Sequence, residues 1–130
     1  MNTKLLMTIS AVFTGIIGFS LTFLPQEIIG SLQITKTPIT QLAFQFLGAL
    51  YLGFTLLNWM AKGSIIGGIY NKPIIIGNLL HFGMTGIALI KAISSISIHK
   101  NVFIILTVLY LLFTVSFGYL FLNNPSKVKS

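Results

Sequence analysis

The chain has 130 residues, of which 55% are hydrophobic and only 7% are charged, and its formal net charge is +7. A soluble domain carries about 25% charged residues, so this composition excludes an ordinary water-soluble fold. The lysines stand singly at the ends of apolar segments, as membrane flanks do, whereas nucleic-acid binding needs a clustered basic face. The sequence contains no cysteine, which excludes disulfides, thiol relays and Cys-ligated metal centres.

Four apolar stretches follow one another along the chain, and each is about as long as the ~20 residues that a helix needs to cross a membrane. We expect spans at residues 5–24, 39–61, 73–97 and 102–122. Pro25 and Glu27 close the first span, and Pro38 and Pro73 suit the first turns of the second and third. The first stretch is longer than the apolar region of a cleavable signal and lacks a small-x-small cleavage site, so we expect it to remain.

These spans predict an all-α fold, a transmembrane four-helix up-down bundle in a single domain, because short connections make sequential helices neighbours. Orientation follows from the distribution of lysines between the two sides. If the spans alternate, one side carries Lys4, Lys62, Lys72, Lys127 and Lys129, and the other carries Lys36, Lys91 and Lys100. The excess on the first side predicts that both termini lie in the cytoplasm of a bacterial cell.

Polar side chains recur along single helical faces within the spans. Such faces should point into the bundle, because unpaired amides and hydroxyls are costly in hydrocarbon. The second span has the longest such face, and the first offers a strip of small residues that admits another helix closely. The faces are Gln41, Gln45, Gly48, Tyr51, Thr55, Asn58 and Lys62 in the second span; Asn78, His81 and Thr85 in the third; Thr107, Tyr110 and Thr114 in the fourth; and Ala11, Gly15, Gly18 and Thr22 in the first.

These polar faces allow two interpretations. Either they only hydrogen-bond one another as interhelical contacts, or they surround a ligand pocket or a permeation path. We expect the span-two face to meet the third span, and expect Gln45, Tyr51, Asn58, Asn78, His81 and Tyr110 to face inward.

His81 is the one titratable residue well inside a predicted span, which makes it a functional candidate. We expect a neutral ring bonded to Asn58, Asn78 or Tyr110, and a satisfied core histidine is the simpler interpretation. A metal site is not expected, because neither a carboxylate nor a second histidine lies within helical reach.

Amides, aromatic rings and lysines also gather around the connection between the second and third spans. Residues 63–73 are rich in glycine and yet apolar, so this loop either rests on lipid headgroups or lines a site. Lysines there could hold the phosphate of an anionic lipid. The candidate binding residues are Asn58, Trp59, Lys62, Tyr70, Asn78, His81 and Tyr110.

Catalytic equipment is not visible in the sequence. It contains no P-loop, no dinucleotide-binding glycine motif, no zinc-protease motif and no hydrolase elbow, and its one carboxylate side chain is Glu27. We therefore predict no catalytic residue, no cofactor and no metal, and the sequence favours a protein without enzymatic activity.

The centre of the chain carries a resemblance. The segments N58-W-M-A-K-G-S64, G67-G-I-Y-N-K-P73 and G77-N-L-L-H-F82 resemble the middle of small four-span bacterial membrane proteins of unknown function, and more loosely the DoxX-like group. Some DoxX-like proteins are linked to sulfur-compound or quinone redox systems, and others to membrane-protein assembly. The resemblance implies a four-span layout and transfers no catalytic residue.

Three functions follow as hypotheses. The first is a non-catalytic accessory or assembly component of the cytoplasmic membrane, with a membrane-protein partner or a second copy of the chain. The alternative is a bundle that binds a lipid or a quinone-like small molecule near the cytoplasmic face. A small enzyme or permease subunit is the weakest of the three, because acid–base groups are missing. Membrane lipids are expected partners, and nucleic acid is not.

Overall fold

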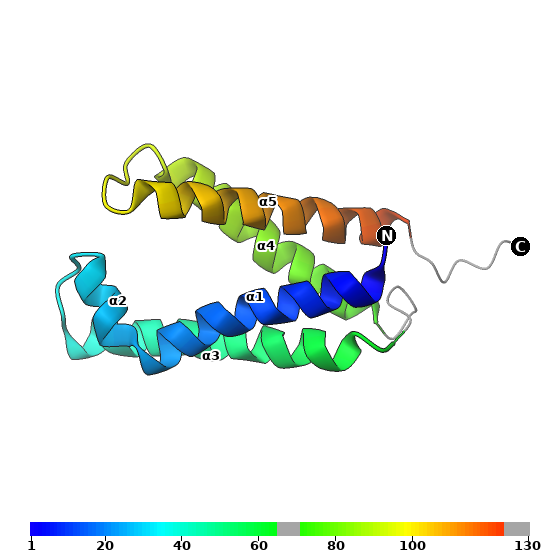
Figure 1. Ribbon diagram of the computed structural model, residues 1–130, viewed down its shortest axis with the longest axis horizontal. Coiled ribbons are helices and arrows are strands. Elements are labelled where there is room, and N and C mark those ends of the chain that lie inside the picture. Colours follow the sequence, from blue (N-terminus) through cyan, green and yellow to red (C-terminus); the bar gives the residue numbers. More distant parts are fainter. Residues whose placement is uncertain (65–70, 124–130) are drawn as a thin grey trace, which may run out of the picture. The chain divides into compact units, whose positions relative to one another are not determined.

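The computed structural model describes residues 1–64 and 71–123, and this part of the chain is helical with short connections. Four of its helices are long and apolar enough to cross a membrane, which confirms the all-α fold class and the four predicted spans. A further, short helix follows the first span. Figure 1 shows the helices in chain order: α1 (Thr3–Phe23), α2 (Pro25–Ser31), α3 (Pro38–Ala61), α4 (Lys72–Ala92) and α5 (Lys100–Leu122).

Two of the long helices begin at side-chain caps. The Oδ1 atom of Asn2 accepts a hydrogen bond from the backbone N–H of Leu5 at 3.1 Å, and this cap starts α1 two residues before the predicted span. At α3, the Thr37 hydroxyl accepts the N–H of Thr40 at 3.0 Å, and Pro38 occupies the first turn as predicted. Local chemistry therefore sets both starts.

The third span ends earlier than predicted. We expected it to reach residue 97, but α4 ends at Ala92, and turns follow it. The sequence there is Ile93-Ser94-Ser95-Ile96, and serine hydroxyls compete with the helical hydrogen bonds of the backbone while β-branched residues lower helix propensity. The apolar character continues beyond Ala92, but the helix does not.

Helix α2 lies in a segment for which the sequence predicts only a short connection. Pro25 stands at the first helical position, and Glu27 lies in the first turn, where a carboxylate favours the positive end of a helix. Ile29 is 1% exposed, and α2 packs against α1 and α3. Two signals typical of a helix start were therefore present in the sequence, within a segment of only seven residues.

The chain divides into two compact units, Met1–Lys62 and Gly63–Ser130. The expectation of a single domain stays a prediction. In the first unit α1 and α3 pack along each other, and in the second unit α4 packs along α5. Helices α4 and α5 are consecutive in the chain, and α1 and α3 are joined through the short helix α2, so each unit is a hairpin of two long helices.

Small residues bring α1 and α3 very close together. A Cβ atom placed on Gly48 would lie 2.8 Å from the backbone nitrogen of Thr22 and 3.0 Å from the carbonyl oxygen of Gly18. No side chain fits there without moving a backbone. Gly18 and Thr22 belong to the small-residue strip predicted for the first span, and the close approach that it predicted is found against α3.

The second unit is built around Phe82 of α4, which is 0% exposed. Its ring stacks on Phe113 at 4.5 Å and on Phe117 at 5.7 Å between ring centroids, and it meets Tyr110 edge-on at 5.4 Å. Aromatic pairs at these distances contribute energy beyond the area that they bury. This cluster joins α4 to α5.

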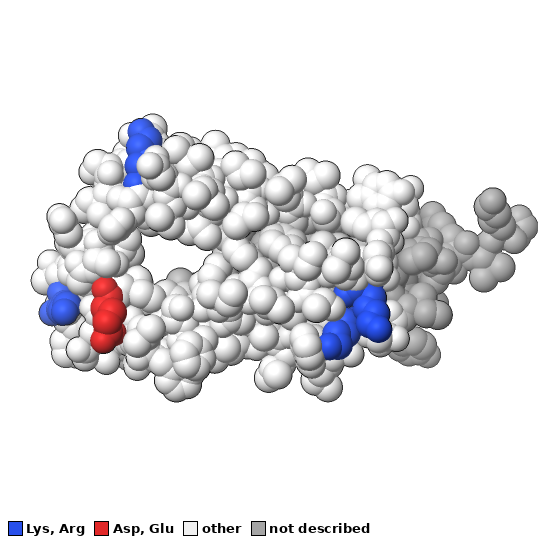
Figure 2. All heavy atoms as spheres, in the orientation of Figure 1, with Lys and Arg blue, Asp and Glu red and all other residues white. Residues whose placement is uncertain are grey.

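The outward surfaces of the helices are apolar. In the most apolar 18-residue stretch of each of the four long helices, only 11–39% of the residues are buried. On the face shown in Figure 2, the charged side chains lie near helix ends, and the surfaces between them are uncharged. This distribution suits helices that stand in hydrocarbon with their ends at the headgroups.

Candidate functional site

The polar face of α3 meets α1. Asn58 is 0% exposed, and its Nδ2 donates a hydrogen bond to the Ser10 hydroxyl at 3.1 Å. One turn away, the Oγ1 atoms of Thr14 and Thr55 are 3.0 Å apart. The prediction that Asn58 and Tyr51 face inward is confirmed, since Tyr51 is 6% exposed.

The sequence predicts that the third span meets this face and indicates only small residues in the first span. Ser10 and Thr14 were missed, although their spacing of four residues, continued by Gly18, is the same helical signal that was used for the other spans. Ser10 and Thr14 are both 0% exposed, so α1 contributes buried polar groups as well.

Trp59 and Lys62 lie at the end of α3. Trp59 is 48% exposed, and the Lys62 ammonium stands over its ring with Nζ 2.9 Å from the ring centroid. The spacing of three residues puts both side chains on one helical face, where a cation and an aromatic ring attract each other. A cation and an indole therefore share one end of the first hairpin.

Asn78, His81 and Tyr110 belong to the second unit. Asn78 is 1% and Tyr110 is 2% exposed, which confirms that both face inward, and His81 is partly buried. The Nδ2 of Asn78 donates to the carbonyl oxygen of Ile74 at 2.9 Å. The His81 ring lies 6.0 Å from the Tyr110 ring and 5.0 Å from the Phe82 ring, so it borders the aromatic cluster.

Tyr70, the remaining candidate, and the tail lysines Lys127 and Lys129 lie outside the described residues, as does most of the glycine-rich loop. The candidates that are described divide between the two units: Asn58, Trp59 and Lys62 in the first, and Asn78, His81 and Tyr110 in the second. A joint site made from both sets stays a prediction.

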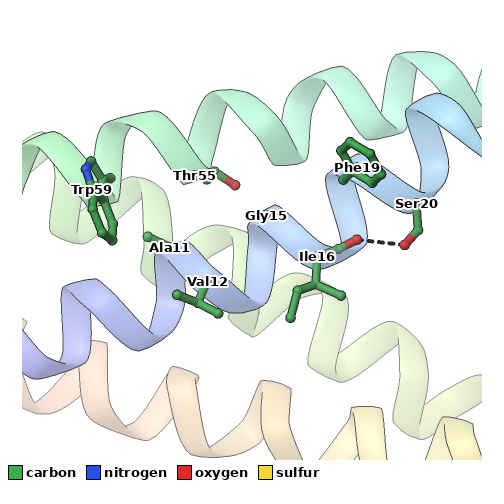
Figure 3. Close-up of a pocket in the computed structure, with 8 residues that line it drawn as sticks. All are labelled: Ala11, Val12, Gly15, Ile16, Phe19, Ser20, Thr55 and Trp59. Atoms are coloured by element: carbon green, nitrogen blue, oxygen red, sulfur yellow. Dashed lines mark hydrogen bonds between the residues drawn. The ribbon is translucent and has the colours of Figure 1, made fainter.

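The hairpin of α1 and α3 carries a groove that the sequence analysis did not predict (Figure 3). Its volume is about 470 Å³, and its walls are mainly apolar. It is lined by Ala11, Val12, Gly15, Ile16, Phe19, Ser20, Thr55 and Trp59. The only sequence signal was the small-residue strip with Gly15, which was interpreted as a helix contact.

A second, smaller hollow lies near the other end of this hairpin, where α2 meets the start of α3. It has a volume of about 290 Å³ and is lined by Gln26, Ile29, Lys36, Thr37, Pro38 and Gln41. The Nε2 of Gln26 donates to the Oε1 of Gln41 at 3.2 Å across it. This exposed amide pair joins α2 to the start of α3.

Among the described residues, no group of three or more His, Cys, Asp or Glu side chains is placed to hold a metal ion. The polar groups described above can donate and accept hydrogen bonds, but they supply no pair of carboxylates for acid–base chemistry.

Comparison of the sequence with family models, with curated proteins and with solved structures gave no match. The helices themselves define the class: a multi-pass helical membrane protein, with four helices of spanning length and apolar composition.

Proposed function

We propose that the protein is a non-catalytic accessory or assembly component of a bacterial cytoplasmic membrane, with both termini in the cytoplasm. The observation that carries this proposal is the contrast between the two kinds of surface on the spans. Polar groups such as Asn58, Ser10 and Asn78 are buried and bonded within the hairpins, whereas large apolar side chains cover the outward faces.

Such a protein has little to offer a reacting substrate and much to offer another membrane helix. Leu50 of α3 and Val115 of α5 are 65% and 71% exposed, in the middle of their helices. In a membrane, helices associate through packing and interhelical hydrogen bonds rather than through the hydrophobic effect. An accessory role therefore requires a partner whose shape fits one of these faces. The loose resemblance to the DoxX-like group, some of whose members are linked to membrane-protein assembly, agrees with this proposal.

Site-specific photo-crosslinking in the membranes of the source organism tests the proposal. A photoreactive residue is placed at Leu50 or at Val115, one on each hairpin, and at the buried Tyr51 as the matched control on the same helix. We expect one discrete protein adduct of constant mass from an exposed position and none from Tyr51. If the exposed positions give lipid adducts alone, the accessory role is refuted.

Binding of a lipid or a quinone-like molecule is the second candidate function. The specific observation in its favour is the groove of about 470 Å³ on the first hairpin, since small-molecule sites commonly have volumes of about 300–1,000 Å³.

A further inference from the structure

The groove on the first hairpin exists because Gly15 has no side chain. A Cβ atom there would lie 3.2 Å from the Cγ2 atom of Thr55, so the floor of the groove is where α1 and α3 touch. Val12 and Ile16 form its wall on the α1 side, and Trp59 forms its wall on the α3 side (Figure 3). Val12 is 50% and Ile16 is 65% exposed, which shows that the groove opens outward.

The length of the groove fits one leaflet of a bilayer. Its α1 side runs from Ala11 to Ser20, which is roughly 14 Å at 1.5 Å per residue. The hydrocarbon core is ~30 Å thick, so one leaflet contributes about half of that depth. The groove begins about 12 Å along α1 from Thr3, and Gly15 lies about 18 Å along it, so an extended apolar chain that enters from the Thr3 end reaches Gly15 near the middle of the membrane.

Charge marks one end of this groove. Trp59 lines it, and Lys62 lies one helical turn further toward the end of α3, with its ammonium over the indole ring. The only acidic residue of the sequence is Glu27, which lies in α2, between the end of α1 and the start of α3. Because α1 and α3 run antiparallel, Glu27 and Lys62 are at opposite ends of the hairpin, and no carboxylate of this unit neutralises Lys62.

We propose that this groove binds one acyl chain of an anionic phospholipid, with the phosphate held by Lys62 and the chain lying over Gly15 between α1 and α3. Lysine at the membrane surface attracts anionic headgroups. Trp59 suits the boundary between the headgroup and the chain, because its ring has an apolar body and a polar N–H. The site does not depend on the accessory role, since a lipid can occupy it whether or not a protein partner exists.

Trp59 is the only tryptophan in the sequence, so its fluorescence reports on this groove alone. The protein is reconstituted in vesicles that mix phosphatidylglycerol and phosphatidylcholine, in which one lipid at a time carries brominated acyl chains that quench tryptophan. At equal mole fractions we expect brominated phosphatidylglycerol to quench as if it bound about fivefold more strongly, a ratio typical of one lysine contact.

Two variants separate the headgroup from the chain. Lys62→Gln should bring the ratio between the two lipids to about one while quenching by both continues. Gly15→Leu fills the floor and should lower quenching by both lipids. Gly53→Leu is its control, because a Cβ atom on Gly53 of α3 meets nothing within 4 Å. Each variant is compared with itself across the two lipids, which removes any change in the intrinsic emission of Trp59.

The proposal is overturned if the parent shows no preference between the two lipids, or if Lys62→Gln keeps the preference of the parent. It is also overturned if neither brominated lipid quenches Trp59, because a second copy or a partner helix then covers the groove. Should Gly15→Leu fail to fold, as judged by its helical circular dichroism, the Lys62→Gln comparison still decides the matter.

Discussion

The contact between α1 and α3 at Gly48 makes the most quantitative prediction. In the variant Gly48→Ala, the new Cβ atom would stand 2.8 Å from the Thr22 nitrogen and 3.0 Å from the Gly18 carbonyl oxygen. The Thr22 hydroxyl, which is closer still, could turn aside, but these two backbone atoms cannot, so the helices must separate. Overpacking of this kind costs about 1–3 kcal/mol.

Gly53 provides the control on the same helix, because a Cβ atom there has no neighbour within 4 Å. Gly53→Ala removes backbone freedom from the unfolded chain and should stabilise α3 by up to about 1 kcal/mol. The two alanine variants should therefore differ in free energy of unfolding by about 1–4 kcal/mol. This difference corresponds to a ratio of roughly 5- to 700-fold between their folding equilibrium constants.

The assay is reversible unfolding in mixed micelles by increasing mole fractions of a denaturing detergent. Trp59 serves as the reporter because it lies in the wall of the groove between the two helices. Gly48→Ala should unfold at a lower detergent fraction than the parent, and Gly53→Ala at the same or a higher one. Equal stability of the two variants, or the reverse order, would refute the close approach of α1 and α3.

Three further predictions concern the buried bonds, the aromatic cluster and the topology. A double-mutant cycle of Asn58→Leu and Ser10→Ala should give a coupling of about 0.5–2 kcal/mol in the same unfolding assay, as expected for an interhelical hydrogen bond in a membrane, and a coupling of zero would contradict that bond. Phe82→Ala should lower the free energy of unfolding by about 3–5 kcal/mol, because it empties the centre of three aromatic contacts, and a loss below about 1 kcal/mol would contradict the cluster. A single cysteine at Thr35, in a sequence that has no other cysteine, should react with an impermeant reagent on intact cells, whereas a single cysteine at Ser64 should react only after the membrane is opened, and labelling of Ser64 on intact cells would exclude cytoplasmic termini.

The sequence by itself determined the helices and the faces on which their polar groups lie. Run length alone requires that residues such as those of α3 and α5 form helices, because hydrocarbon leaves every unpaired backbone group unsatisfied. The spacing of Tyr51 and Asn58 on one face predicted their burial, since a polar side chain in a span has few alternatives to an inward position.

Only the tertiary structure decided what those faces meet. Periodicity states that Asn58 points inward, but the bond to Ser10 of α1 depends on how the two helices cross and on their relative stagger. The same holds for α2, whose seven residues are too few to form a stable helix alone and which packs against α1 and α3.

The groove shows this division most clearly. Gly15 and Gly48 are both visible in the sequence, but the effect of a small residue on the surface depends on which atoms of the other helix face it. At Gly48 the backbone of α1 faces the small residue and leaves no room for a side chain; at Gly15 the side chain of Thr55 lies against the small residue, and an open groove lies over this contact. A hollow is formed by the surfaces of two helices together, so the residues of one helix do not predict it.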